Sequence, residues 1–119
     1  MKKKILIVDD EEALSKVIST ILEEDNYEVK TAVNGKDALE KLAAYLPDLI
    51  LTDVNMPEMD GEELCKKIRE SETYMHIPII ACSGRDNGDI MIKAGANDYL
   101  SKPFKIENLE NKLKQYLGE

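Results

Sequence analysis

The chain has 119 residues, of which 43% are hydrophobic and 34% are charged, and its formal net charge is −8. This length suits one domain around one core, and this balance is typical of a folded globular protein rather than a disordered chain. A surface this acidic repels phosphate backbones, so we expect no direct binding of nucleic acid.

The N-terminus begins with the basic residues 2–4, as a signal peptide does, but only four apolar residues follow before the acids 9–12. That run is too short for an export signal, and no stretch approaches the length of a membrane span. We therefore expect a cytoplasmic protein without a membrane segment. Cys65, Cys82 and His76 have no metal-site or redox spacing, and we interpret them as core fillers and a loop residue.

Short apolar runs alternate with amphipathic segments along the whole chain. Asn34 and Asp60 each precede an amphipathic segment, with an acid three residues later, as at capped helix starts. Pro47 ends the second helix, and Gly95 can close the fourth. The predicted strands are 4–8, 28–33, 48–52, 77–82 and 98–101, and the predicted helices are 12–25, 35–46, 61–70, 89–94 and 106–117.

Five strand–helix units predict an α/β fold with a parallel sheet covered by helices on both faces. Right-handed crossovers then give a flavodoxin-like (βα)5 doubly wound sheet in strand order 2-1-3-4-5, a three-layer sandwich. The strand at 28–33 lies at the edge of this sheet. We expect one domain over residues 1–119, with no internal repeat, linker or output domain.

Polar side chains stand at the carboxyl ends of four predicted strands, and in such sheets ligands bind beyond those ends, where the strand order reverses. Taken singly, each has an ordinary interpretation: acids favour helix starts, and a Lys-Pro pair is common where a strand ends. Their joint placement on neighbouring strands favours one shared site. These residues are Asp9, Asp10, Asp53, Ser83 and Lys102.

Clustered carboxylates repel one another, so either one is protonated or a cation neutralises them. A donor set of oxygens alone suits Mg²⁺, which also binds phosphate oxygens. This combination matches phosphoryl transfer, in which catalysis is mainly positioning and charge neutralisation. Asp53 would attack the phosphorus and form an acyl phosphate, and Lys102 and Ser83 would bind phosphoryl oxygens.

The sequence closely resembles the receiver domain of two-component response regulators along nearly its whole length. No single motif decides this, but their combination and order are highly specific. The matching residues are Ile7-Val8-Asp9-Asp10-Glu11, Asp53-x-x-Met56-Pro57-x-Met59-Asp60-Gly61, Ser83-Gly84, and Gly95-Ala96-Asn97-Asp98-Tyr99-Leu100-Ser101-Lys102-Pro103-Phe104.

The resemblance implies a role for each matching residue. Asp53 is the expected phosphoacceptor, and the expected Mg²⁺ ligands are Asp10, Asp9 (through water), Asp53 and the Asn55 backbone carbonyl. Lys102 is the expected phosphate-binding lysine, with a cis bond to Pro103. Ser83 and Tyr99 are the expected switch pair.

The resemblance also implies partners. The phosphoryl donor would be a phosphohistidine on a histidine kinase or a histidine phosphotransfer protein. The switch would change a protein-binding face made by helix 89–94, strand 98–101 and helix 106–117. Apart from its own phosphorylation and dephosphorylation, the protein would not be an enzyme. A phosphorelay intermediate and a partner-binding regulator both fit, whether free-standing or part of a longer protein.

Three features depart from the family pattern. The interval from Ser83 to Lys102 is a few residues short, so the fourth helix is expected to be short or irregular. Lys105 precedes the last helix and cannot accept backbone hydrogen bonds as a cap. Arg85 lies two residues beyond Ser83, and we hypothesise that it shields the acyl phosphate or pairs with it.

Two other functions compete with this one. A Mg²⁺-dependent phosphohydrolase with an aspartyl nucleophile often has a second acid two residues later, but Asn55 holds that position and cannot act as an acid or base. The chain is also short for a substrate-binding cap. A phosphorylation-independent binding module is the third possibility, and the intact Asp10, Asp53 and Lys102 weigh against it.

Overall fold

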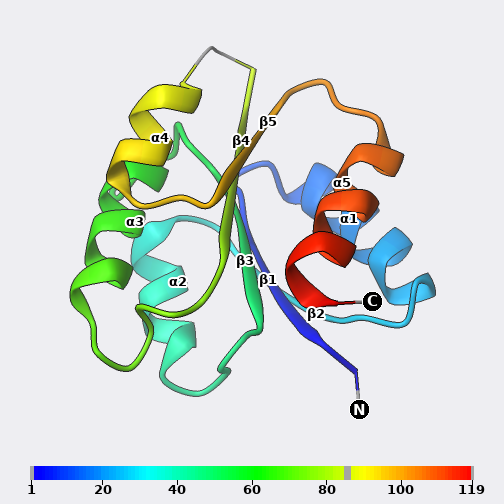
Figure 1. The fold of residues 1–119 in the computed structure, drawn as a ribbon, viewed down its shortest axis with the longest axis horizontal. Helices are drawn as coiled ribbons and strands as arrows, with labels where there is room; N and C mark the ends of the chain where they lie inside the picture. Colours follow the sequence, from blue (N-terminus) through cyan, green and yellow to red (C-terminus); the bar gives the residue numbers. More distant parts are fainter. Residues whose placement is uncertain (1, 85–86, 119) are drawn as a thin grey trace.

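The computed structural model describes residues 2–84 and 87–118, and Figure 1 shows the fold. Strand and helix alternate five times, as the sequence predicts. No helix within the described ranges is long and apolar enough to cross a membrane. The elements are β1 (Lys4–Val8), α1 (Glu12–Glu24), β2 (Glu28–Ala32), α2 (Gly35–Leu42), β3 (Leu49–Asp53), α3 (Gly61–Glu70), β4 (Ile79–Ser83), α4 (Gly88–Ala94), β5 (Asp98–Ser101) and α5 (Ile106–Leu117).

All neighbouring strands run parallel, in the order β2-β1-β3-β4-β5. The predicted flavodoxin-like sheet is therefore confirmed, with β2 at one edge. The helices α1 and α5 cover one face, and α2, α3 and α4 cover the other (Figure 1). Because the strand order reverses between β1 and β3, the crevice that can hold a ligand lies beyond their carboxyl ends.

Strands buried on both faces supply two hydrophobic clusters, one to each helical layer. Successive residues of β1 alternate between them: Leu6 and Val8 face α2, α3 and α4, whereas Ile5 and Ile7 face α1 and α5. Both cysteines are buried and unpaired, as expected for core fillers. This packing on both sides fixes the strand ends that carry the site.

The prediction that α2 reaches residue 46 was wrong, because the helix ends at Leu42. Leu46 is 57% exposed, and the ring of Tyr45 is buried instead, with the ammonium groups of Lys4 and Lys30 about 5.5 and 5.4 Å from its centre. The apolar spacing of Leu46 fitted a helix, but the packing of Tyr45 against the edge of the sheet ends it earlier.

Two strand boundaries matter for the site. β3 and β4 each run one residue beyond their predicted ends, so Asp53 and Ser83 are the last residues of their strands rather than the first residues of loops. The backbones of both residues are therefore held by strand pairing.

Asp98 joins the start of β5 to α5. Its carboxylate accepts hydrogen bonds from Lys112 Nζ at 2.9 Å, from the Tyr116 hydroxyl at 3.1 Å and from the Tyr99 backbone N–H at 2.8 Å. Burial alone raises the pKa of this carboxyl, but these hydrogen bonds and the Lys112 charge together bring the pKa below its usual value. A carboxyl with a lowered pKa stabilises the fold above its unfolded pKa and loses that contribution as the pH falls through the folded pKa.

We therefore expect the unfolding free energy of an Asp98→Asn variant to fall less with decreasing pH than that of the wild type. Between about pH 6 and about pH 3, the wild type would lose ~1 kcal/mol more unfolding free energy than the variant, after allowance for solvent screening. Urea denaturation at several pH values measures this. Parallel pH profiles for the two proteins would show that Asp98 does not stabilise α5 in this way.

Candidate functional site

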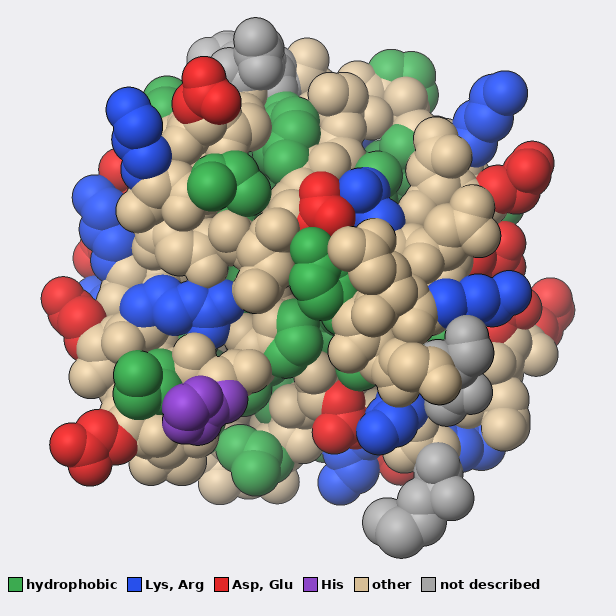
Figure 2. Space-filling model, in the orientation of Figure 1, with side chains coloured by type: hydrophobic (Ala, Val, Ile, Leu, Met, Phe, Trp, Pro, Cys, Tyr) green, Lys and Arg blue, Asp and Glu red, His purple; other side chains and the backbone are tan. Residues whose placement is uncertain are grey.

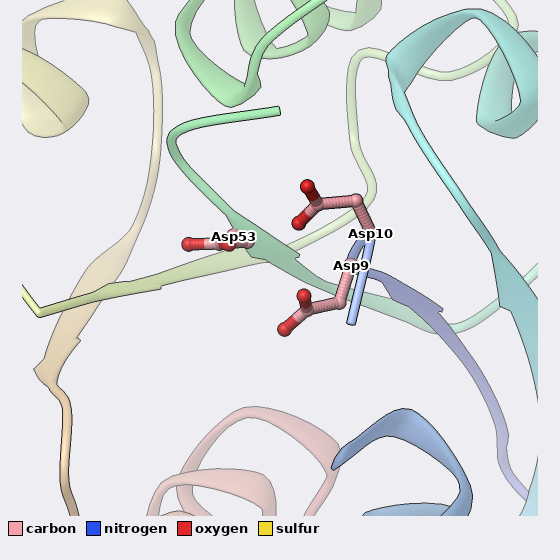
Figure 3. Close-up of side chains that lie close together, drawn as sticks. All are labelled: Asp9, Asp10 and Asp53. Carbon is pink, nitrogen blue, oxygen red and sulfur yellow. The ribbon is translucent and has the colours of Figure 1, made fainter. Parts of the chain in front are cut away.

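The predicted residues meet at the carboxyl edge of the sheet. Asp9 and Asp10 follow β1, Asp53 ends β3, and Figure 3 shows the three side chains projecting into the same space beyond the strand ends. A cleft of about 400 Å³ opens there. It is lined by Asp10, Glu11, Asp53, Asn55, Ser83, Gly84 and Lys102.

The three carboxylates are crowded. One oxygen from each of Asp9, Asp10 and Asp53 lies within 4.8 Å of the other two. Asp9 is 4% exposed and Asp53 8% exposed, whereas Asp10 faces solvent. Burial raises the pKa of Asp53, and the neighbouring acids add to this, against opposing effects of the Lys102 charge and the Val54 backbone N–H. The cluster therefore favours a neutralising cation.

Lys102 provides a positive charge at the same place. Its Nζ donates to Asp9 Oδ2 at 2.9 Å and lies 3.7 Å from Asp53 Oδ2. Burial works to lower the pKa of this lysine, but the hydrogen bond to Asp9 and the nearby acids raise it above its usual value, so the ammonium stays charged. The backbone N–H of Lys102 donates to the Ser83 carbonyl at 2.7 Å, and the bond to Pro103 is cis, as expected.

The loop after β3 is fixed at both ends. Asp53 Oδ1 accepts from the Val54 backbone N–H at 2.8 Å, and the Val54 carbonyl accepts from the Gly61 N–H at 2.8 Å. The Asp60 side chain caps α3 by accepting from the Glu63 N–H at 3.0 Å, as predicted. These bonds leave Asp53 Oδ2 as the carboxylate oxygen that faces Lys102.

Ser83 and Tyr99 are adjacent, although Tyr99 does not line the cleft. Ser83 is buried, and the Tyr99 hydroxyl donates to its backbone carbonyl at 3.4 Å. Sequence reasoning missed Asn87, whose side-chain amide donates to Ser83 Oγ at 3.3 Å. Its position near the start of the predicted helix 89–94 was the available signal, because asparagine is a common helix cap.

Residues 5–114 match the profile of the response regulator receiver domain family. The chain belongs to this family. The full 119-residue length superposes on a response regulator from Chloroflexus aurantiacus with a TM-score of 0.94 and 34% identity, covering 100% of both chains.

Two further relatives are similar over nearly the whole of this chain. The alkaline phosphatase synthesis transcriptional regulatory protein PhoP of Bacillus subtilis is 36% identical over 118 residues, which cover 98% of this chain but 49% of PhoP. This receiver domain thus spans about half the length of that relative. The receiver domain of the sensor histidine kinase PA1611 from Pseudomonas aeruginosa, with a magnesium ion coordinated in its active site cleft, has a TM-score of 0.90, 31% identity and 100% coverage of both chains.

This receiver domain also shows the expected departures. The helix α4 has only seven residues and ends at Ala94, and the following Gly95 has a left-handed φ of 119°. Lys105 makes no side-chain hydrogen bond to the start of α5. The hypothesis on Arg85 falls outside the described residues.

Removing one of the crowded charges should stabilise the receiver domain without metal. A carboxyl with a raised pKa costs stability as the pH rises through that pKa, so Asp53→Asn removes this cost at neutral pH. We expect the melting temperature in EDTA to rise by ~2–5 °C for Asp53→Asn, and by less for the exposed Asp10→Asn. Glu40→Gln, an exposed position on α2, is the control. A lower melting temperature in both aspartate variants than in the wild type would show that the crowded charges do not destabilise the fold.

Proposed function

We propose that this receiver domain takes a phosphoryl group from a phosphohistidine onto Asp53 and signals through a changed protein-binding face. The observation that carries the proposal is the placement of Asp53 Oδ2 beside the Lys102 ammonium group and among further carboxylates, at the point where the strand order reverses. These are the groups that a transferring phosphoryl needs around its acceptor.

The proposed step forms a bond between Asp53 Oδ2 and phosphorus and breaks the bond from phosphorus to the donor's imidazole nitrogen, which keeps the electron pair. The Val54 N–H holds Oδ1, so Oδ2 is the free nucleophile. Lys102 Nζ, 3.7 Å from Oδ2, would bind one phosphoryl oxygen, and the Ser83 hydroxyl would bind another. Asp9 keeps the lysine oriented through its 2.9 Å hydrogen bond.

The donor set fits Mg²⁺, because it offers carboxylate oxygens without sulfur or imidazole. Asp10, Asp53 and the Asn55 backbone carbonyl would hold the ion, with Asp9 acting through water. When bound, the ion neutralises negative charge on the acids and on the phosphoryl group. The magnesium ion in the PA1611 receiver domain supports this assignment.

Magnesium should stabilise the wild type by mass action. Saturating Mg²⁺ is expected to raise the unfolding free energy by ~1–3 kcal/mol, measured by urea denaturation with and without the ion. Asp10→Asn is expected to lose most of this increase. An unchanged wild-type midpoint in millimolar Mg²⁺ would contradict the site, whereas equal shifts in wild type and Asp10→Asn would place the ion elsewhere.

Two surfaces suit the proposed partners. A groove of about 470 Å³ between α1 and the start of α5 adjoins Lys102 and is lined by apolar residues such as Leu14, Ile18 and Phe104, so we assign it to the histidine kinase or phosphotransfer donor.

The face made by α4, β5 and α5, seen in Figure 2, carries hydrophobic side chains among charges of both signs. Ile90 and Ile92 on α4 are each 48% exposed. We assign this face to the downstream partner, and we place the exchange in the cytoplasm, where ATP supplies the kinase.

Incubation with acetyl phosphate and Mg²⁺ tests the proposal. We expect the intact mass to rise by one phosphoryl group and the tyrosine fluorescence to change as Tyr99 moves. The phosphohydrolase alternative predicts turnover of an external phosphate ester, for which Asn55 offers no acid or base. A wild-type protein that gains no phosphoryl mass from acetyl phosphate or from a phosphohistidine protein would overturn the proposed function.

A further inference from the structure

Asn87 contacts both members of the proposed switch pair. Its side-chain Nδ2 donates to Ser83 Oγ at 3.3 Å, and its backbone N–H donates to the Tyr99 hydroxyl at 3.4 Å. The same tyrosine hydroxyl donates to the Ser83 backbone carbonyl at 3.4 Å. One residue at the start of α4 therefore ties the end of β4 to the middle of β5.

This arrangement leaves the start of α4 without a side-chain cap. Asn87 occupies the N-cap position, but its side chain makes no capping hydrogen bond, and its backbone has φ −112° and ψ 12°. The caps of α2 and α3 behave differently: Asn34 and Asp60 have extended backbones, and each accepts a hydrogen bond from the residue three positions later. Asn87 thus has the right residue type for a cap, yet its amide is directed to Ser83.

Gly88 brings the first turn of α4 against the tyrosine ring. A Cβ at this position would lie 3.4 Å from Tyr99 Cδ2, so the backbone of α4 rests directly beside the ring. A rotation of the Tyr99 ring would therefore change what the first turn of α4 packs against.

We propose that Asn87 is a positioning residue that holds Ser83 and Tyr99 in the unphosphorylated arrangement, and that its release allows it to cap α4. The proposal rests on the proposed function, in which the Ser83 hydroxyl turns toward a phosphoryl oxygen. That movement breaks the hydrogen bond from Asn87 Nδ2 to Ser83. The released Asn87 side chain then turns so that its Oδ1 accepts from the Ile90 N–H. The loss at Ser83 and the gain at α4 bias one two-state element, which links the cleft to the exposed face of α4.

Substitution of Asn87 separates the two halves of the proposal. Serine caps a helix about as well as asparagine but is too short to reach Ser83, whereas alanine does neither. The probe is beryllofluoride with Mg²⁺, a non-transferable phosphoryl analogue, titrated by tyrosine fluorescence. We expect Asn87→Ser to bind it about two- to tenfold more tightly than the wild type, the value of one hydrogen bond, and Asn87→Ala to bind more weakly than Asn87→Ser.

Controls distinguish positioning from general stability. Glu40→Gln, on the exposed side of α2, should leave the affinity unchanged. In a Ser83→Ala background, Asn87→Ser should no longer tighten binding, because the hydrogen bond it removes is already absent. In the unsubstituted protein, NMR should show the Asn87 side-chain amide shifting and the Ile90 N–H gaining protection when the probe binds, so the proposal stays testable if a variant fails to fold.

The outcomes separate this inference from the proposed function. If the wild type does not bind the probe, the proposed function fails. If the wild type binds it and Asn87→Ser has the same or weaker affinity, only the positioning role of Asn87 is overturned. Equal affinities for the serine and alanine variants, with no protection at Ile90, would overturn the capping half.

Discussion

A Lys102→Met variant will accept phosphoryl groups ~100- to 1,000-fold more slowly than the wild type, the usual cost of removing one preorganised group that stabilises developing charge. Lys102 is the only cationic side chain among the described residues that line the cleft. Its Nζ lies within 4 Å of both Asp9 and Asp53. Its loss would therefore remove the proposed phosphoryl-binding group and leave the proposed acceptor beside uncompensated negative charge.

The same substitution should lower the unfolding free energy without metal by ~1–3 kcal/mol, because two buried carboxylates lose their ion partner. Phosphorylation is followed by intact mass with acetyl phosphate and Mg²⁺, and stability by urea denaturation. Lys66→Met is the matched control, since Lys66 forms an exposed pair with Glu62 on α3. Phosphorylation of Lys102→Met at the wild-type rate would remove this lysine from the mechanism.

A Gly61→Ala variant will lose ~3 kcal/mol or more of unfolding free energy. An added Cβ would overlap the Asp53 carbonyl oxygen and lie 3.0 Å from Val54 Cα, and both are backbone atoms. They cannot move aside easily, because the Gly61 N–H is bonded to the Val54 carbonyl at 2.8 Å and β3 is paired on both sides. Steric conflict in a packed region is one of the mechanisms that produce large losses of stability.

Any folded fraction of Gly61→Ala should also be phosphorylated more slowly than the wild type, because the end of β3 that carries Asp53 must shift. Gly84→Ala is the control for stability, since a Cβ there meets no atom of the described residues within 4 Å, and we expect a change below ~0.5 kcal/mol. Urea denaturation measures both. Equal stability of the two alanine variants would mean that the close approach of α3 to Asp53 is not tight.

The order of strands and helices was predictable because burial on both faces leaves continuous apolar runs, and caps such as Asp60 mark helix starts. The site followed from topology, since parallel strands bring Asp9, Asp53 and Lys102 to one edge wherever they stand in the chain. The residues themselves suggested the roles of Asp53, Lys102 and Ser83 in phosphoryl transfer. The resemblance to receiver domains then added the finer roles, such as the Asn55 carbonyl as a metal ligand and Ser83 with Tyr99 as a switch pair.

Contacts between distant side chains were not predictable. Arg69 on α3 donates to the carbonyls of Met75, Ile77 and Gly95 at 2.8–2.9 Å and to Asn97 Oδ1 at 2.7 Å, and so fixes the connection into β5. Nothing in its sequence neighbourhood marks these partners. The early end of α2 and the diversion of Asn87 from capping were missed for the same reason, because tertiary packing overrides local propensity there.

The most direct measurement locates the phosphoryl group on the chain. After reaction with acetyl phosphate and Mg²⁺, reduction with borohydride converts an aspartyl phosphate to homoserine, and peptide mass spectrometry then identifies the modified position. We predict conversion at Asp53 and none in Asp53→Asn. Conversion at Asp9 or Asp10 in the wild type, or an Asp53→Asn variant that gains phosphoryl mass as fast as the wild type, would contradict the assignment of Asp53 as the acceptor.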